Sequence, residues 1–318
     1  MIILVGYTGF VGSNIYARAY NRIDGVFNSH NIEKAYGLEP ELLVYAGLRA
    51  EKFLANSAPE RDLELILQAE ENIRQINPRK LILISNVDVY ANPVGVTEES
   101  RALGEGGAGI QPYGLNRYYL EAWVRKNYPD ALIIRLPSLY GVNIKKNFIY
   151  DLINVIPSML KKSKYEELLA KEPRLSSYYE PQDNGYYKCR VLAKEDKSAL
   201  RQMFRKLGFT AINFTDSRNV YQFYPLRRLW GDIQIALDAN LTLLNAATEP
   251  ISAAELFKYI TGDVLKNEFA AAPAKYDVKT LHADKFGGKD GYIYTKEDIL
   301  EDIKSFVDMN SVREEFLK

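Results

Sequence analysis

Histidine and cysteine are almost missing from this chain. Its 318 residues include one cysteine, Cys189, and two histidines, His30 and His282. A single cysteine excludes an internal disulfide bond and a cluster of thiolates. Two histidines argue against a metal site of the histidine-rich kind. We therefore expect neither a metal centre nor a disulfide framework.

The chain also lacks net charge and long apolar runs. Its 41 acidic and 41 basic side chains cancel, so no overall field draws it to nucleic acid or to anionic lipid. No apolar stretch approaches the ~20 residues that cross a bilayer, and the first residues lack the basic start and cleavage site of a signal peptide. We expect a cytoplasmic protein without a nucleic-acid or membrane partner.

What the first half does contain is an alternation of strand-like and helix-like segments. Short apolar runs predict strands buried on both faces at Ile2–Gly6, Gly25–Ser29, Leu42–Gly47, Lys80–Asn86 and Ala131–Gly141. Helical spacing predicts helices at Val11–Tyr20, Pro59–Asn77 and Pro112–Asn127. The stretch from Ala91 to Gln111 is rich in Gly and Pro and is expected to be a loop. This alternation is typical of an α/β fold with a doubly wound parallel sheet.

The second half has a looser pattern. We expect residues 1–148 to form one domain and residues 149–318 to form mainly a second, smaller α/β domain, with segments that return to the main sheet. The predicted elements there are strands at Tyr186–Leu192, Asn219–Leu226 and Leu241–Ala247 and helices at Lys194–Phe209 and Arg228–Asn240. Ser252 and Glu255 have the spacing of a capping box, which predicts the start of another helix.

Three glycines follow the first predicted strand, in the stretch GYTGFVG (Gly6–Gly12). The helix that begins there presents free N–H groups and roughly half a positive charge, which hold a diphosphate well. Gly6 allows the tight turn, Gly9 leaves room for the phosphates, and Gly12 lets the helix pack close to the strand. A plain strand-turn-helix is the alternative, but three glycines at this spacing favour dinucleotide binding by residues 1–148.

Further motifs make the chain resemble the extended short-chain dehydrogenase/reductase superfamily, which includes nucleotide-sugar epimerases, dehydratases and reductases. After the glycines follow, in the family's order, LLVYAG, LILISNVDVYANP, PYGLNRYYLEAWV, LIIRLPSLYG and the segment 229–262. The dTDP-sugar reductases are the most similar members, and about 161–220 looks like an unusual insertion. The resemblance implies a Rossmann-like sheet, a bound NAD(P) and a smaller C-terminal domain that binds the substrate.

The family mechanism, as the resemblance implies it, uses three groups. A tyrosine acts as acid or base on a sugar hydroxyl or ketone while hydride moves to or from the nicotinamide. A lysine four residues further on supplies positive charge, and a Ser or Thr at a neighbouring strand end donates to the same oxygen. Because free tyrosine has a pKa of ~10, work near neutral pH calls for a pKa lowered by about 3 units.

This chain departs from the family at two of those three positions. Tyr113 matches the tyrosine, but Arg117 stands at the lysine position and Asn86 at the Ser/Thr position, with Ser85 one place earlier. We expect these four residues to be catalytic, with Arg117 contacting the cofactor ribose or the substrate. Ser85 reaches the site only if the strand end twists, because neighbouring strand residues face opposite sides. Asp88 falls where dehydratases carry Glu, and we interpret it as a turn-forming carboxylate.

The resemblance also implies the residues that hold the ligands. Cofactor contacts are expected from Gly6, Thr8, Gly9, Phe10, Val11, Gly12, Asn28, Ala46, Gly47 and Pro137. Substrate contacts are expected from Ser138, Asn147, Phe148 and Arg227. The end of the second strand has neither the acid of typical NAD binders nor the arginine of NADP binders. We favour NAD and leave NADP open.

Two functions remain open from the sequence. One is an NAD(P)-dependent epimerase, dehydratase or reductase that acts on a nucleotide-linked sugar. The other is a dinucleotide-binding protein that has lost catalysis and acts as a sensor or scaffold. Tyr113 favours the enzyme, whereas Arg117 and Asn86 favour the alternative. We expect the enzyme, because a positive charge and a polar strand end are both retained, and a homodimer through the helices 59–77 and 112–127.

Overall fold

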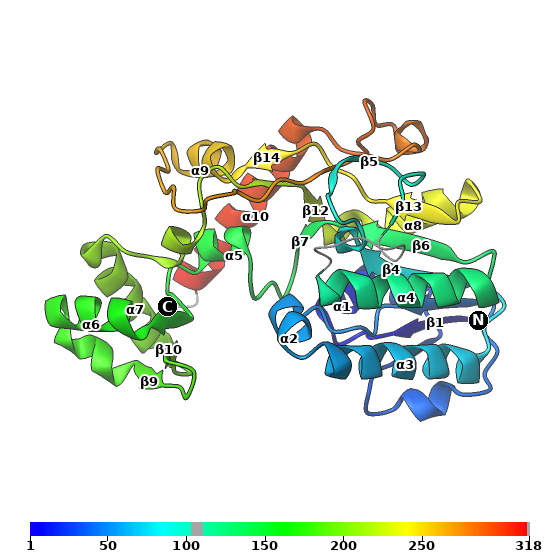
Figure 1. Cartoon of the computed structure of the whole chain (residues 1–318), viewed down its shortest axis with the longest axis horizontal. Helices are drawn as coiled ribbons and strands as arrows, with labels where there is room; N and C mark the ends of the chain where they lie inside the picture. The colour runs from blue at the N-terminus through cyan, green and yellow to red at the C-terminus, as the bar shows by residue number, and fades with distance from the viewer. Residues whose placement is uncertain (103–110, 317–318) are drawn as a thin grey trace. The chain divides into compact units, whose positions relative to one another are not determined.

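A parallel sheet forms the centre of the first of two compact units (Figure 1). The computed structural model describes residues 1–102 and 111–316, and within them the sheet has six strands in the order β13-β6-β4-β3-β1-β2. The strands are β1 (Ile2–Val5), β2 (Gly25–Phe27), β3 (Leu42–Tyr45), β4 (Leu81–Asn86), β6 (Leu132–Leu136) and β13 (Leu243–Asn245). Every neighbouring pair is parallel, which confirms the predicted α/β fold class.

Helices cover both faces of this sheet. They are α1 (Phe10–Ala19) and α8 (Leu229–Asp238) on one face and α3 (Pro59–Ile76) and α4 (Pro112–Asn127) on the other. Successive strand residues point to opposite faces, so Leu4 packs in the core with Ile15 of α1, while Ile3 packs in the core with Ile66 of α3. The continuous apolar runs of the sequence are explained by this double burial.

The strand order places the glycine turn at a defined point of the sheet. The chain runs from β1 through α1 to β2 on one side, and β3 then pairs with β1 on its other side. The direction of winding therefore reverses at β1. In open α/β sheets, ligands bind at the carboxyl ends of the strands where this reversal occurs. The turn after β1 is such a place.

Two predicted strands are each divided in the structure. Ala131–Gly141 forms β6 and a separate β7 (Ser138–Tyr140), because Pro137 between them has no N–H to continue the ladder. Asn219–Leu226 forms β11 (Val220–Tyr221) and β12 (Phe223–Pro225), and β12 pairs with β7. The break falls at Gln222, whose buried amide donates to the carbonyl oxygens of Thr248 and Val278.

The expected loop from Ala91 to Gln111 contains a strand. β5 (Val94–Val96) pairs with β15 (Asp277–Val278), far away in the sequence, so the loop prediction is wrong there. Its part at 103–110 lies outside the described residues. The first unit also has α2 (Lys52–Ser57) and the short 3-10 helices η1 (Ile32–Ala35), η2 (Val87–Val89), η5 (Leu226–Arg228) and η6 (Ala283–Phe286).

The second unit has its own sheet and core. Its elements are α5 (Phe148–Ile153), β8 (Met159–Lys161), α6 (Lys162–Lys171), η3 (Pro173–Ser177), β9 (Tyr179–Pro181), β10 (Tyr186–Cys189), α7 (Lys194–Leu207), η4 (Ala211–Phe214) and α9 (Ala253–Thr261). β8, β10 and β9 form an antiparallel sheet, and Leu160, Leu168 and Phe204 pack in its core. The stretch that resembles an insertion is therefore folded.

The division of the chain into units is discontinuous. The first unit comprises Met1–Ile144, Val220–Ile251 and Ala274–Asp302, and the remaining segments make the second unit. The predicted boundary at residue 148 lies four residues after the end of the first segment, and β13 is one of the segments that return to the main sheet. β14 (Ile251–Ser252) and α10 (Lys296–Phe316) each run from the first unit into the second. Within the described part of the chain, none of the helices has both the length and the apolar character of a membrane span.

Candidate active site

The turn between β1 and α1 requires glycine at two positions. Gly6 has a φ of +90°. A Cβ there would lie 2.3 Å from the carbonyl oxygen of Ala46, which follows the adjacent strand β3. A Cβ at Gly12 would lie 2.1 Å from the carbonyl oxygen of Gly6. Any side chain at either position would collide with the backbone, so these glycines are a steric requirement of the turn itself.

Gly9 differs, because a Cβ there would meet only the Gly6 carbonyl oxygen, at 3.2 Å. Gly9 is the N-cap of α1 and provides no side-chain cap, and Thr8 beside it is exposed. The first amides of the helix, at Phe10 and Val11, have no partner within the helix. The turn thus offers bare N–H groups and a positive helix end without a side chain over them. That is the arrangement expected for a diphosphate cradle.

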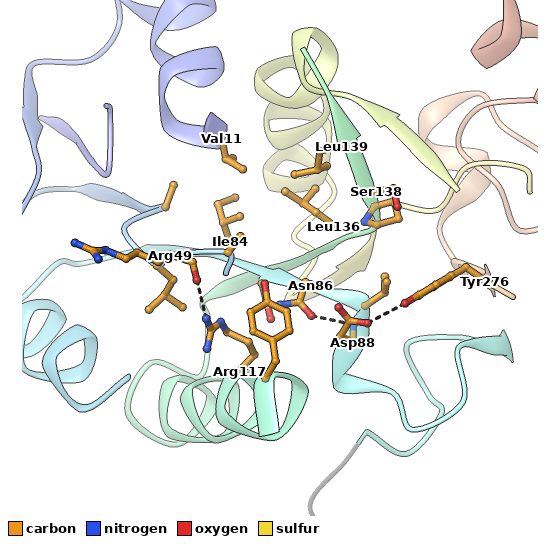
Figure 2. Close-up of a pocket in the computed structure, with 17 residues that line it drawn as sticks. Val11, Arg49, Ile84, Asn86, Asp88, Arg117, Leu136, Ser138, Leu139 and Tyr276 are labelled. Carbon is orange, nitrogen blue, oxygen red and sulfur yellow. Dashed lines mark hydrogen bonds between the residues drawn. The ribbon is translucent and has the colours of Figure 1, made fainter. Parts of the chain in front are cut away.

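A cavity of about 180 Å³ lies within the first unit at the carboxyl ends of β3, β4 and β6 (Figure 2). The sequence-predicted residues that line it are Val11, Ala46, Ser85, Asn86, Tyr113, Arg117, Pro137 and Ser138. Val11 comes from the glycine turn's helix and Tyr113 from α4, so the two motifs meet at one cavity. The structure therefore brings together residues that the sequence separates by about a hundred positions.

Tyr113 is buried in the wall of this cavity. No hydrogen bond to its hydroxyl is found among residues 1–102 and 111–316. Burial raises its pKa, Arg117 opposes this, and the carboxylates of Asp88 and Asp62 add to the rise. The lowered pKa that we expected is therefore wrong for the structure as it stands. A phenol in this environment stays protonated near neutral pH and is suited to donate a proton.

Arg117 is bound from three sides and is 3% exposed. Its guanidinium makes a bidentate pair with Asp62 of α3, with N···O distances of 2.7 and 3.0 Å. It also donates to the Arg49 carbonyl oxygen at 2.8 Å and lies 4.4 Å from the centre of the Tyr113 ring. Figure 2 shows the bond to Arg49. Arg117 thus ties together α3, the loop after β3 and the tyrosine, with its charge balanced inside the protein.

The hydroxyl of Ser85 is engaged away from the reacting position. It lies 2.6 Å from an oxygen of the fully buried Glu121, and because a carboxylate only accepts, Ser85 is the donor. Glu121 is in turn held by Arg135 at 2.6 Å, which donates to Tyr90 as well. This network corrects the expectation that Ser85 donates to a reacting oxygen, because its hydroxyl already donates to Glu121. The next residue, Asn86, points to the other face of the strand.

That neighbour, Asn86, presents an amide group at the cavity. Its Oδ1 accepts the N–H of Asp88 at 2.9 Å and so caps η2. This bond fixes the orientation of the amide, and no described residue accepts a hydrogen bond from its Nδ2. The Nδ2 group is a donor in the cavity wall. At the position where the resemblance implies a Ser or Thr hydroxyl, this chain thus presents an amide N–H group.

Lys52 and Tyr276 were missed by the sequence analysis, and Asp88 was interpreted as structural. Lys52 of α2 lies 2.7 Å from Asp88 Oδ1, and the hydroxyl of Tyr276 lies 3.2 Å from the same oxygen. Asp88 and Tyr276 both line the cavity. Burial lowers the pKa of Lys52, but Asp88 and Tyr276 outweigh this and leave it raised, so the lysine is charged. The three residues lie up to 224 positions apart, and no local pattern links them.

The ends of β2 and β3 form the rest of the expected cofactor side. Ala46 donates to the carbonyl oxygen of Val5 and lines the cavity, while Gly47 beside it is exposed. Asn28 lies just beyond β2, where its Oδ1 accepts the N–H of His30 at 2.9 Å. Its side chain is thus used in a local turn.

Three residues expected at the substrate lie elsewhere. Arg227 pairs with Asp302 at 2.7 Å and does not line the cavity. Asn147 caps α5 in the second unit and lines a separate cavity of about 310 Å³ there, and Phe148 is buried beside it. Asp151 also lines that cavity, and burial raises its pKa to about 7. The residues described contain no cluster of His, Cys, Asp and Glu that could hold a metal ion.

Comparisons with known proteins identify the fold. No protein-family model and no curated protein matches the sequence. Among solved structures, the chain is similar over 100% of its length to 99% of a UDP-glucose 4-epimerase from Thermotoga maritima with UDP-glucose, at 16% identity and a TM-score of 0.61. It is similar over 100% of both chains to a short-chain dehydrogenase/reductase superfamily protein from Agrobacterium tumefaciens with bound NAD, at 14% identity and a TM-score of 0.62.

A third similar structure is RMD from Pseudomonas aeruginosa complexed with NADPH. The similarity covers 98% of this chain and 99% of that chain, at 14% identity and a TM-score of 0.62. At these identities the likeness concerns the fold. The predicted Rossmann-like α/β fold is confirmed, and the similarity extends over the whole chain.

Proposed function

We propose that this protein is an NAD(P)-dependent oxidoreductase or epimerase that acts on a nucleotide-linked sugar. The observation that supports it most is that Val11, at the start of the helix after the glycine turn, and Tyr113 line one cavity. The similar solved structures hold UDP-glucose, NAD or NADPH, which is consistent with this class of ligands. We favour NAD, although the end of β2 carries no charge that decides between NAD and NADP.

The residues at the turn fit the diphosphate of such a cofactor. Gly9 leaves the helix end open, and the Cβ positions at Gly6 and Gly12 are filled by backbone. A bound nicotinamide supplies the group that accepts or releases hydride. The amides of Phe10 and Val11 would hold the phosphates, and Ala46 and Pro137 would lie against the rest of the cofactor, since both line the cavity.

The proton is handled by Tyr113 in this proposal. Its hydroxyl is protonated and has no hydrogen-bond partner among the described residues. It can therefore donate to the oxygen of a sugar ketone as the carbonyl carbon receives hydride. Asn86 Nδ2 and Ser138 lie at the same cavity and would orient that oxygen. A protonated tyrosine suits reduction of a ketone, and we therefore favour a reductase within this class. Arg117 positions Tyr113 instead of contacting the ligand.

The alternative of a non-catalytic dinucleotide binder is less well supported. A lysine position that had decayed would leave Arg117 exposed or poorly paired. Here the guanidinium has a bidentate partner in Asp62, a carbonyl acceptor and an aromatic face. Bidentate and stacked positions suit arginine and not lysine, so this set of partners favours a site adapted to arginine.

Binding and turnover measurements test the proposal. Mass spectrometry of the purified intact protein shows whether a dinucleotide is retained, and calorimetry gives the affinities for NAD⁺, NADH, NADP⁺ and NADPH. The protein is then supplied with a panel of UDP-, dTDP- and GDP-sugars and their keto derivatives. We expect micromolar dinucleotide binding and cofactor-dependent conversion of at least one sugar. Absence of dinucleotide binding contradicts both functions, whereas binding without any turnover supports the sensor or scaffold.

A homodimer through α3 and α4 remains a proposal as well. Leu65 and Leu67 of α3 and Tyr119 of α4 are exposed apolar side chains on these helices. Light scattering at micromolar concentration tests it: a mass near 73 kDa, twice the 36.3 kDa of the chain, is expected for the dimer.

A further inference from the structure

A three-residue cluster on one side of the cavity has no role in the chemistry proposed so far. Lys52 Nζ and the Tyr276 hydroxyl both approach Asp88 Oδ1, at 2.7 and 3.2 Å, and they lie 3.4 Å from each other. The three residues come from α2, η2 and the segment before β15. Figure 2 shows Asp88 and Tyr276 together on one side of the cavity, well apart from Val11 on the other.

The two contacts leave half of the Asp88 carboxylate unused. Both partners bind Oδ1, and within residues 1–102 and 111–316 no group donates to Oδ2. The backbone N–H of Asp88 is bound to Asn86, so the base of the side chain is fixed as well. A carboxylate oxygen can only accept, and its natural partner is a hydroxyl or an N–H group of a ligand.

The free polar atoms of this cavity indicate which ligand fits. Asp88 Oδ2 is an acceptor, whereas Asn86 Nδ2 and the protonated Tyr113 hydroxyl are donors. All three residues line the same cavity, and none of these three atoms has a hydrogen-bond partner among residues 1–102 and 111–316. An oxygen that accepts from the donors, next to a hydroxyl that donates to the carboxylate, satisfies all of them. Neighbouring oxygens of a sugar ring have this pattern.

We infer that Asp88 determines the sugar specificity of the site by accepting a hydrogen bond from a hydroxyl of the substrate's sugar, and that Lys52 and Tyr276 are positioning residues that hold its carboxylate. This inference rests on the proposed function and adds the group that distinguishes one sugar from another. A surface ion pair of Lys52 and Asp88 alone contributes little to stability. It does not explain why the partly buried Tyr276 lines the cavity and shares the same carboxylate oxygen.

The test compares ligands that have and lack the sugar. With NAD⁺ present, calorimetry gives the affinities of wild-type protein for UDP, UDP-glucose, UDP-N-acetylglucosamine, dTDP-glucose and GDP-mannose. For the nucleotide sugar that binds best, Asp88→Ala is expected to weaken binding about 10- to 100-fold, as for loss of a hydrogen bond to a charged group. The affinities for NAD⁺ and for the free nucleoside diphosphate should stay within about twofold.

Positioning variants separate this role from a structural one. Tyr276→Phe and Lys52→Met should lower the affinity for the sugar nucleotide several-fold and leave the affinities for NAD⁺ and the free diphosphate unchanged. Lys52→Arg should keep most of the wild-type affinity. Glu51→Ala, which removes an exposed carboxylate next to Lys52, is the matched control and should change nothing.

The outcomes are distinct. If Asp88→Ala binds every nucleotide sugar as wild type does, the inference is overturned, while NAD⁺ binding and turnover keep the proposed function intact. If Asp88→Ala lowers the affinities for the sugar nucleotide and for the free diphosphate equally, Asp88 has a structural role in the site, and the inference is again overturned. If wild-type protein binds NAD⁺ but no nucleotide sugar, the proposed function fails and the inference with it.

Discussion

The two sides of the cavity are built by different means. At the glycine turn the groups available to a ligand are backbone amides, and the steric limits come from backbone atoms within a few residues or from the loop after the adjacent strand. On the side of Tyr113 the wall is made of side chains, including those of Tyr113, Asn86, Asp88 and Tyr276. Partners from α2 and α3 hold some of them: Lys52 pairs with Asp88, and Asp62 pairs with Arg117. The first side keeps the glycine spacing on which the resemblance rests, and the second departs from the resembled pattern at Arg117 and Asn86.

The difference shows where such a site can change. A backbone turn tolerates almost no substitution, because any added Cβ at Gly6 or Gly12 meets a carbonyl oxygen. A side-chain arrangement can exchange one cation for another if a partner is supplied elsewhere. Arg117 with Asp62 illustrates this, since the two residues lie on different helices and are both buried. Substitutions on each side should therefore have separable effects, which the following experiments measure.

The largest effect is expected on the side-chain half, from Tyr113→Phe. Loss of the only proton donor that we assign should lower kcat about 10²- to 10⁴-fold. Because the ring remains, the affinity for NAD⁺ should be unchanged. Steady-state kinetics and calorimetry measure the two quantities. Tyr119→Phe, at an exposed position of the same helix, is the control. Full turnover by Tyr113→Phe would show that another group handles the proton.

On the backbone half, Gly9→Asp should weaken NAD⁺ binding about 100-fold. The new carboxylate stands where the diphosphate is expected and repels it, while its Cβ meets only the Gly6 carbonyl oxygen at 3.2 Å, so the fold should survive. Circular dichroism checks the fold and calorimetry the affinity. Gly231→Asp on α8, where a Cβ meets nothing within 4 Å, adds the same charge away from the site. Unchanged NAD⁺ affinity in Gly9→Asp would remove the turn from the site.

A third substitution tests whether Arg117 is adapted to its place. Arg117→Lys keeps the charge but loses the bidentate geometry with Asp62 and the bond to Arg49, so a buried carboxylate is left partly unpaired. We expect a loss of about 1–3 kcal/mol in the free energy of unfolding, measured in urea, and no gain in kcat. Arg74→Lys, in an exposed pair with Glu71, should cost less than about 0.5 kcal/mol. A rise in kcat would instead indicate a decayed lysine site.

The smallest effect concerns a carboxylate without such a partner, in the second unit. The carboxylate of Asp151 has no hydrogen bond or ion pair among the described residues, and burial raises its pKa to about 7, against about 3.9 in the unfolded chain. The folded state keeps a proton that the unfolded state has lost between about pH 4 and pH 7. Stability is therefore lost as the pH rises through this window.

The variant Asp151→Asn removes that titration. Between pH 5 and pH 8 it should lose less stability than wild type, by on the order of 1–2 kcal/mol because the side chain is partly exposed. Thermal melting at the two pH values measures this difference. Asp183→Asn, whose carboxyl group is in an exposed turn of the same unit, is a control and should follow wild type. Parallel pH profiles of wild type and Asp151→Asn would contradict the assignment.

Local patterns in the sequence predicted most of the central sheet. The apolar runs gave β1, β3 and β4 within two residues at either end, and prolines at the first turn gave the starts of α3 and α4. Ser252 and Glu255 form the capping box that their spacing predicted. The divided strands and β5 were missed because their ends depend on pairing partners distant in the chain.

The candidate site was predicted to a different extent on its two sides. The glycine spacing identified the turn, because a positive φ and a close backbone approach limit a position to glycine whatever surrounds it. No such local limit applies to Ser85, and only the structure shows that its hydroxyl donates a hydrogen bond to Glu121. Nothing in the sequence around Lys52 distinguishes it from the other lysines of the chain.

The sequence by itself thus determined a parallel α/β sheet with a glycine turn after its first strand, because burial on both faces and steric exclusion act on residues close together in the chain. Only the tertiary structure decided which charges neutralise one another. Asp62 reaches Arg117 across 55 positions and Lys52 reaches Asp88 across 36, and an ion pair forms where the folded backbone brings two side chains within about 3 Å. The chemical character of the cavity depends on those pairs.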